Sequence, residues 1–116
     1  MPSLSRIQAS MVALARGHGA ETIDKDGYPG WQPNVDSPLL RRARKVFVDT
    51  TGNEPAVKAI HAGLECGIIG ERLKDMDMIS MGPQIEHPHS PSERVKIDSV
   101  ERFYNTLKAL VADLAG

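Results

Sequence analysis

Two histidines and two acidic residues lie within eight positions of one another in the segment 86–93, which reads EHPHSPSE. Imidazole and carboxylate are, after thiolate, the side chains that zinc binds most readily. Pro88 and Pro91 stiffen the backbone around His89, which lowers the entropy lost when a ligand is fixed. Alternate residues of an extended segment point to opposite sides, so His87 and His89 are not expected to reach one ion. The segment therefore indicates either a metal ligand or a surface loop with incidental histidines.

A second group of polar residues, from His61 to Gly67, follows a predicted buried strand over residues 56–60. In parallel α/β proteins, ligands bind outside the carboxyl ends of the strands. The backbone N–H groups of residues 63–66 would open the next helix and could hold an anion such as a carboxylate. Glu65 lies in that first turn, where the helix dipole favours negative charge. The alternatives are that Glu65 only caps the helix and that His61 is a buried, hydrogen-bonded histidine rather than a general base.

Two other charged groups are interpreted as structural. Asp75 and Asp77 lie where a second strand, over residues 76–81, is predicted to begin, and they indicate a turn that positions it. A cluster of cations falls mostly off the apolar stripe of a predicted helix, which favours a solvated face over the alternative, a phosphate site. The members of this cluster are Arg41, Arg42, Arg44 and Lys45.

The N-terminal third of the chain is predicted to hold one helix and a connector. Apolar residues recur at three- and four-residue steps over residues 3–16, and Gly17 and Gly19 are typical of a helix end. A short strand is predicted over 20–25. Two glycines and two prolines make the segment 26–36 a turn-rich connector and a boundary between substructures.

Two helices dominate the rest of the chain. Ser37 and Pro38 predict a helix start, as N-cap and first helical residue, for a helix that ends near Asp49. Asp98 and Glu101 have the spacing of a capping box, which predicts that a final helix begins after Asp98. Between these two helices we expect a strand over residues 56–60, a short helix over 68–73, a second strand over 76–81 and a loop over 83–97.

This order predicts the α/β class, with a partial sheet flanked by helices. Two buried strands joined by a helix form a parallel pair with a right-handed crossover. Two strands alone make a poor sheet, because their outer edges need partners. We therefore expect that the remainder of the sheet comes from elsewhere, and self-association of the chain is one source.

Composition narrows the function classes. The 116 residues include 14 Lys and Arg and 15 Asp and Glu, so the net charge is −1. This balance excludes a general polyanion binder, and we expect no nucleic-acid partner. There is no apolar run of about 20 residues and no signal-peptide pattern, so no membrane partner is expected either. The single cysteine, Cys66, excludes a disulfide framework and fits a reducing, cytoplasmic location.

Four motifs in fixed order give the sequence a family resemblance. They are DGYPGWQPN at 26–34, VKAIHAGLECG at 57–67, DMDMISMGP at 75–83 and HSPSERV at 89–95. Together they closely resemble the C-terminal part of bacterial aminoacyl-histidine dipeptidases, also called Xaa-His dipeptidases or peptidase D. These enzymes are relatives of carnosinase among the co-catalytic zinc metallopeptidases.

The resemblance implies a place in a larger enzyme. Residues 1–25 correspond to the last helix and strand of a lid domain, 26–36 to the crossing between domains, and 37–116 to the C-terminal part of a two-zinc exopeptidase catalytic domain. His89 corresponds to a zinc ligand of the complete enzyme. Gly63 and Glu65 correspond to a loop that borders the substrate pocket.

Two positions depart from the family pattern, and both lie in the His89 loop. Ser92 stands where the family more often has Asp or Asn, and His87 stands where a glycine is common. Neither departure alters the proposed ligand, but both bear on the conformation of the loop.

The sequence lacks the other parts of that family's catalytic centre. It has no His-x-Asp motif and no Glu-Glu pair, so at most one zinc ligand is present and no general base. We therefore expect a C-terminal segment of a dipeptidase, inactive alone, whose partners are a dipeptide substrate and the remainder of the catalytic domain. The alternatives are a non-catalytic interaction module that forms a homo-oligomer, and a small metal-binding protein that uses Glu86, His87, His89 and Glu93.

Overall fold

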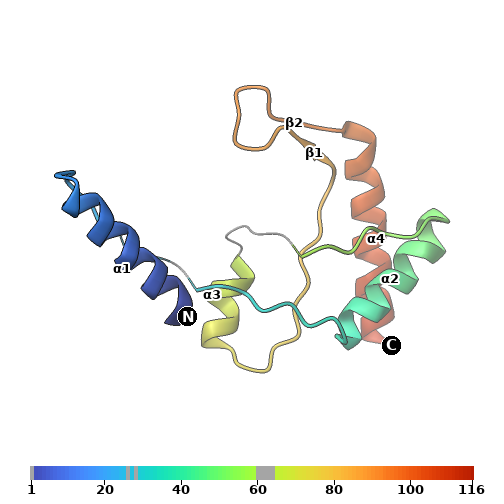
Figure 1. The fold of residues 1–116 in the computed structure, drawn as a ribbon. Helices are drawn as coiled ribbons and strands as arrows, with labels where there is room; N and C mark the ends of the chain where they lie inside the picture. Colours follow the sequence, from blue (N-terminus) through green and yellow to red (C-terminus); the bar gives the residue numbers. More distant parts are fainter. Residues whose placement is uncertain (1, 26, 28, 60–64) are drawn as a thin grey trace. The chain divides into compact units, whose positions relative to one another are not determined.

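The computed structural model describes residues 2–25, 27, 29–59 and 65–116. Its elements are, in chain order, α1 (Pro2–Gly17), α2 (Pro38–Thr51), α3 (Glu65–Arg72), β1 (Ile85–Glu86), β2 (Arg94–Val95) and α4 (Ile97–Ala115) (Figure 1). They belong to two compact units. Unit 1 comprises Met1–Gln32 and Ala62–Lys74, and unit 2 comprises Pro33–His61 and Asp75–Gly116. The assignment of these parts to a lid and a catalytic domain stays a prediction.

In unit 1, the predicted first helix is confirmed as α1. Gly19 has φ 76° and follows the helix, where the Ala20 and Gly19 N–H groups donate to the carbonyls of Ala15 and Arg16 at 3.0 Å each. This is the hydrogen-bond pattern of a Schellman motif, in which glycine takes the left-handed position without strain.

The strand predicted over 20–25 is not formed. These residues are irregular and run back along α1, where the Thr22 hydroxyl accepts a hydrogen bond from Arg16 Nε at 2.9 Å and Asp24 accepts one from Gln8. Without a neighbouring strand in the described part of unit 1, side-chain bonds to the helix replace a β-ladder.

The predicted helix over 68–73 is α3, which begins three residues earlier, at Glu65. Its buried residue Gly67 lies against the segment that carries the YPGW motif. A Cβ atom at Gly67 would be 2.5 Å from the carbonyl oxygen of Pro29. Glycine is therefore required here by close approach of backbone to backbone.

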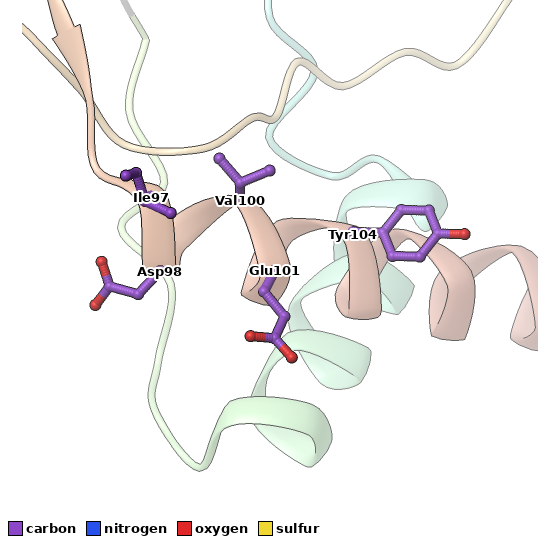
Figure 2. A pocket seen from close by; sticks show the side chains of 5 residues that line it. All are labelled: Ile97, Asp98, Val100, Glu101 and Tyr104. Carbon is purple, nitrogen blue, oxygen red and sulfur yellow. The ribbon is translucent and has the colours of Figure 1, made fainter.

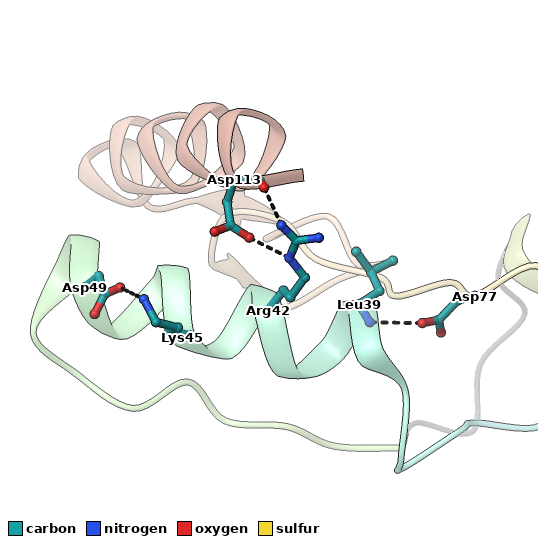
Figure 3. A network of polar contacts seen from close by, with 6 residues as sticks. All are labelled: Leu39, Arg42, Lys45, Asp49, Asp77 and Asp113. Carbon is teal, nitrogen blue, oxygen red and sulfur yellow. Dashed lines mark hydrogen bonds and ion pairs between the residues drawn. The ribbon is translucent and has the colours of Figure 1, made fainter. Parts of the chain in front are cut away.

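In unit 2, the start of α2 is confirmed where Ser37 and Pro38 predict it. Ser37 is 1% exposed, and its hydroxyl accepts a hydrogen bond from the Leu40 N–H at 2.9 Å. Asp77 supplies a second cap, because its Oδ2 accepts from the Leu39 N–H at 3.0 Å (Figure 3). The hydrogen bond from Ser37, followed by that from Leu39, lowers the pKa of Asp77. Asp77 thus fastens the segment after α3 to the start of α2.

The core of unit 2 lies between α2 and α4. Ala43 and Val46 from α2 and Leu110 from α4 are buried together, and Ile79 packs against them. On the same pair of helices, Arg42 Nε lies 2.7 Å from Asp113 Oδ2 (Figure 3).

The predicted parallel strand pair is wrong. Residues 56–59 and 76–81 form no β-ladder, and Val57 is 52% exposed rather than buried; Ile60, the last residue of the first predicted strand, lies outside the described residues. Among the described residues, the only ladder is an antiparallel hairpin within the predicted loop 83–97, with Ile85 opposite Val95. The described fold is therefore a set of helices with one two-stranded sheet.

The final helix is confirmed, but its predicted cap is wrong. α4 begins at Ile97, with Lys96 as N-cap and no side-chain capping bond, so Asp98 lies inside the first turn. The buried Ser99 hydroxyl instead donates to the Lys96 carbonyl at 2.5 Å and accepts from the Gln84 N–H at 2.9 Å. These bonds fix the start of α4 directly after β2.

Candidate functional site

The candidate ligand His89 lies in the loop 87–93 that joins β1 to β2. The two strands are held by their ladder and by an ion pair, with Arg94 Nε 2.5 Å from Glu86 Oε2. The Lys96 N–H donates to the Gln84 carbonyl at 3.0 Å, which continues the pairing up to the residue that precedes α4. The loop is therefore anchored at both ends on regular structure.

Inside the loop, most of the hydrogen bonds involve Ser90. Its hydroxyl donates to the His87 carbonyl at 2.7 Å and accepts from the Ser92 N–H at 3.2 Å. Its carbonyl accepts from the Glu93 N–H at 3.0 Å. The carboxylate of Glu93 accepts from the His89 N–H at 3.4 Å. Polar groups of the loop thus hold the backbone on either side of His89.

His87 and His89 both have left-handed backbone conformations, with φ 50° and 61°. Few residues other than glycine adopt positive φ, although histidine does so more often than most. The premise of an extended segment was therefore wrong, because the chain turns at both histidines. Both side chains are exposed.

The donor set of this loop does not make a zinc site by itself. Structural and catalytic zinc sites use three or four protein ligands, and the described part of the chain brings no three His, Cys, Asp or Glu side chains together to hold a metal. Glu86 is engaged by Arg94, and Glu93 faces the backbone of His89. His89 fits zinc as a single exposed imidazole ligand that needs donors from elsewhere.

The other predicted site lies at the start of α3. Glu65 is its first residue and is exposed. Gly63 and His61 lie outside the described residues, so the predicted pocket around Gly63 and Glu65 stays a prediction.

The cation cluster of α2 is accounted for by partners in unit 2. Arg42 pairs with Asp113, and Lys45 Nζ lies 2.7 Å from Asp49 Oδ2 (Figure 3). Arg44 pairs with Glu54, and Arg41 donates to the Asp36 carbonyl. All four cations are exposed. This supports the interpretation of a solvated helix face over a phosphate site.

A surface depression on α4 offers no convergent chemistry. It is lined by Ile97, Asp98, Val100, Glu101 and Tyr104, all from the first two turns of one helix (Figure 2). Two carboxylates and three apolar side chains on one helix face cannot enclose a substrate. Sequence reasoning did not single out Ser90, and it assigned Asp77 to a turn rather than to the cap of α2. The available signal for Ser90 was Pro88, two residues before it.

Comparison with known proteins identifies a dipeptidase relative and a solved dipeptidase structure. The chain is 40% identical over 102 residues to the cytosol non-specific dipeptidase of Escherichia coli strain K12, an alignment that covers 88% of this chain and 21% of that protein. It also matches the crystal structure of aminoacylhistidine dipeptidase from Vibrio alginolyticus, with a TM-score of 0.69, 39% identity, and coverage of 94% of this chain and 22% of the other. No protein-family model matches the chain.

The chain is homologous to the C-terminal part of these dipeptidases. The resemblance inferred from the four motifs is thereby confirmed. This chain spans about a fifth of the length of either dipeptidase. None of its described helices has the length and apolar character needed to cross a bilayer.

Proposed function

We propose that this dipeptidase homologue is the C-terminal segment of a zinc-dependent dipeptidase and that it supplies His89 as one zinc ligand. The observation that carries the proposal is the presentation of His89. An exposed imidazole stands on a left-handed residue inside a hydrogen-bonded loop, in a chain about 40% identical to dipeptidases. Residues held in left-handed conformations cluster at functional sites. His87 shares this conformation, and the family resemblance is what singles out His89.

The rest of the proposal concerns the reaction of the complete enzyme and the substrate. In the complete enzyme, a zinc pair would activate water and polarise the scissile carbonyl. The residues of this chain would hold one metal through His89 and border the bound dipeptide through Gly63 and Glu65. The names of the two relatives support dipeptides as substrates, including Xaa-His dipeptides, and a cytosolic location.

The segment is proposed to be inactive alone, since it supplies one proposed ligand, His89, where three protein ligands are needed. The first test is therefore hydrolysis of a Xaa-His dipeptide by the purified chain in the presence of zinc. We expect no turnover above that of buffer. Turnover that disappears in His89→Ala would overturn the inactivity of the isolated segment.

The second test places the chain where the proposal says it acts. The corresponding C-terminal fifth of the E. coli dipeptidase is replaced by this chain, and zinc content and dipeptide hydrolysis are measured. We expect an active hybrid that loses zinc and activity in His89→Ala but keeps both in the matched control His87→Ala. A folded hybrid whose zinc content and activity survive His89→Ala would refute the ligand assignment.

One observation favours the alternative, an interaction module that associates with itself. Helix α1 leaves an apolar stripe exposed, formed by Leu4, Ile7, Met11 and Leu14. Such a stripe on a helix usually meets a partner. Sedimentation of the purified chain tests this: a concentration-dependent dimer supports it, and a monomer at all concentrations contradicts it.

A further inference from the structure

The residues 87–90 form a turn that a side-chain hydrogen bond reinforces. Pro88 occupies the second position, where its ring fixes φ near −65°, and His89 occupies the third with φ 61°. This combination is that of a type II β-turn, whose third position normally holds glycine because of the positive φ. A histidine at this position is held against its own backbone preference.

The Ser90 hydroxyl adds a side-chain hydrogen bond to this turn. A β-turn is normally closed by the N–H of the fourth residue, which donates to the carbonyl of the first. The carbonyl of His87, which this backbone bond reaches, also accepts from Ser90 Oγ at 2.7 Å. Ser90 Oγ in turn accepts from the Ser92 N–H at 3.2 Å, so one hydroxyl links the two halves of the loop.

The contrast with Ser92 shows that this role belongs to one serine. In the described structure the Ser92 side chain makes no hydrogen bond, and only its backbone N–H takes part in the loop. Both serines are exposed. The two positions therefore differ in hydrogen bonding and not in burial.

The geometry points to Ser90 as a positioning residue for His89: its hydroxyl holds the His87–Ser90 turn so that the imidazole is preset for metal binding. This inference rests on the proposed function of His89. Residues that orient a metal ligand without touching the metal typically change affinity or activity by about 10–100-fold when they are removed. Ser90 is placed to orient His89 through the backbone of the His87–Ser90 turn.

The conformational half of the inference is tested on the full chain in solution by NMR. A positive φ brings the amide and α protons of a residue close together and gives a strong NOE between them. We expect this NOE at His89 in the wild type, in the control Ser92→Ala and in Ser90→Thr, which restores a hydroxyl. We expect it to weaken in Ser90→Ala. An unchanged NOE in Ser90→Ala would overturn the inference.

The metal half is tested in the hybrid with the E. coli dipeptidase by zinc competition against a chelator. Ser90→Ala should weaken zinc binding by roughly tenfold or more, with Ser92→Ala unchanged and Ser90→Thr largely restored. If His89→Ala leaves zinc binding intact, the proposed function fails. If His89→Ala abolishes zinc binding while Ser90→Ala equals Ser92→Ala, only the positioning role fails. A thermal melt of each variant separates unfolding from lost positioning.

Discussion

Replacing Thr106 with valine should stabilise the protein. Thr106 lies within α4 and is 1% exposed, and its hydroxyl has no hydrogen-bond partner among the described residues. A buried hydroxyl that has lost its water without gaining a partner opposes folding. Valine has nearly the same shape and places a methyl group where the hydroxyl stands.

The size of the effect follows from the burial. Because the side chain is almost fully removed from water, the desolvation of its hydroxyl is nearly complete. That cost is about 1–3 kcal/mol by mutational measurements, so the free energy of unfolding should rise by about the same amount. In a domain of this size, 1 kcal/mol raises the melting temperature by about 4–8 °C.

Thermal and urea unfolding of the full chain, followed by circular dichroism, measures this change. Thr106→Ser is the matched control, because it keeps the unpartnered hydroxyl and removes a methyl group; it should lower stability by about 1 kcal/mol. If Thr106→Val unfolds at a lower temperature than the wild type, the hydroxyl has a hydrogen-bond partner and the reasoning is refuted.

Three further predictions concern the caps and the packing. Asp77→Asn should remove part of the pH dependence of stability. The pKa of the Asp77 carboxyl is lowered mainly by the hydrogen bond from the Ser37 hydroxyl. The stabilisation from the ionised carboxylate is therefore complete above the unfolded pKa of about 4 and is lost as the pH falls through the lower folded pKa. Unfolding of wild type and variant from pH 2 to 7 should show their difference shrinking only at acid pH. Leu110→Ala, in a core residue that is 4% exposed, should cost about 2–5 kcal/mol in denaturant unfolding, and a cost under 1 kcal/mol would contradict the assigned core. Gly67→Ala should destabilise unit 1 by about 1–3 kcal/mol, because the new Cβ meets the Pro29 carbonyl; faster amide exchange in α3 would report it, and slower exchange would contradict it.

Sequence reasoning succeeded where the signal is local. Ser37 and Pro38 marked the start of α2 because a capping hydroxyl and a fixed φ act within one helical turn. The apolar face of α4 likewise predicted a helix where one is found. The cap predicted at Asp98 was wrong because a contact outside the helix sets its start. The hydrogen bonds of Ser99 to the hairpin segment place the first residue of α4 two positions earlier than predicted.

The strands could not be predicted from local pattern. An apolar segment becomes a strand only when a neighbour supplies its ladder, and residues 56–59 and 76–81 have none in the described structure. Strands β1 and β2, in contrast, are joined by a short loop, so each supplies the ladder of the other.

The loop that carries His89 was predicted in part, and its role as a site stays a prediction. The prolines around His89 correctly indicated a loop, and the family resemblance singled out the same histidine. The left-handed conformation of His89 and the bonds of Ser90 were missed, because alternation was reasoned on an extended backbone. Pro88 followed two residues later by a serine is the signal that would have suggested a closed turn.

The pairing of α2 with α4 has a consequence for synthesis on the ribosome. Arg42 and Asp113, which join these helices, are 71 residues apart. At about 5–20 residues per second, α2 leaves the ribosome roughly 4–14 s before its partner is complete. During that interval the apolar face of α2 has no α4 to cover it. The nascent chain should therefore engage a chaperone such as a ribosome-bound holdase, and release should coincide with emergence of α4.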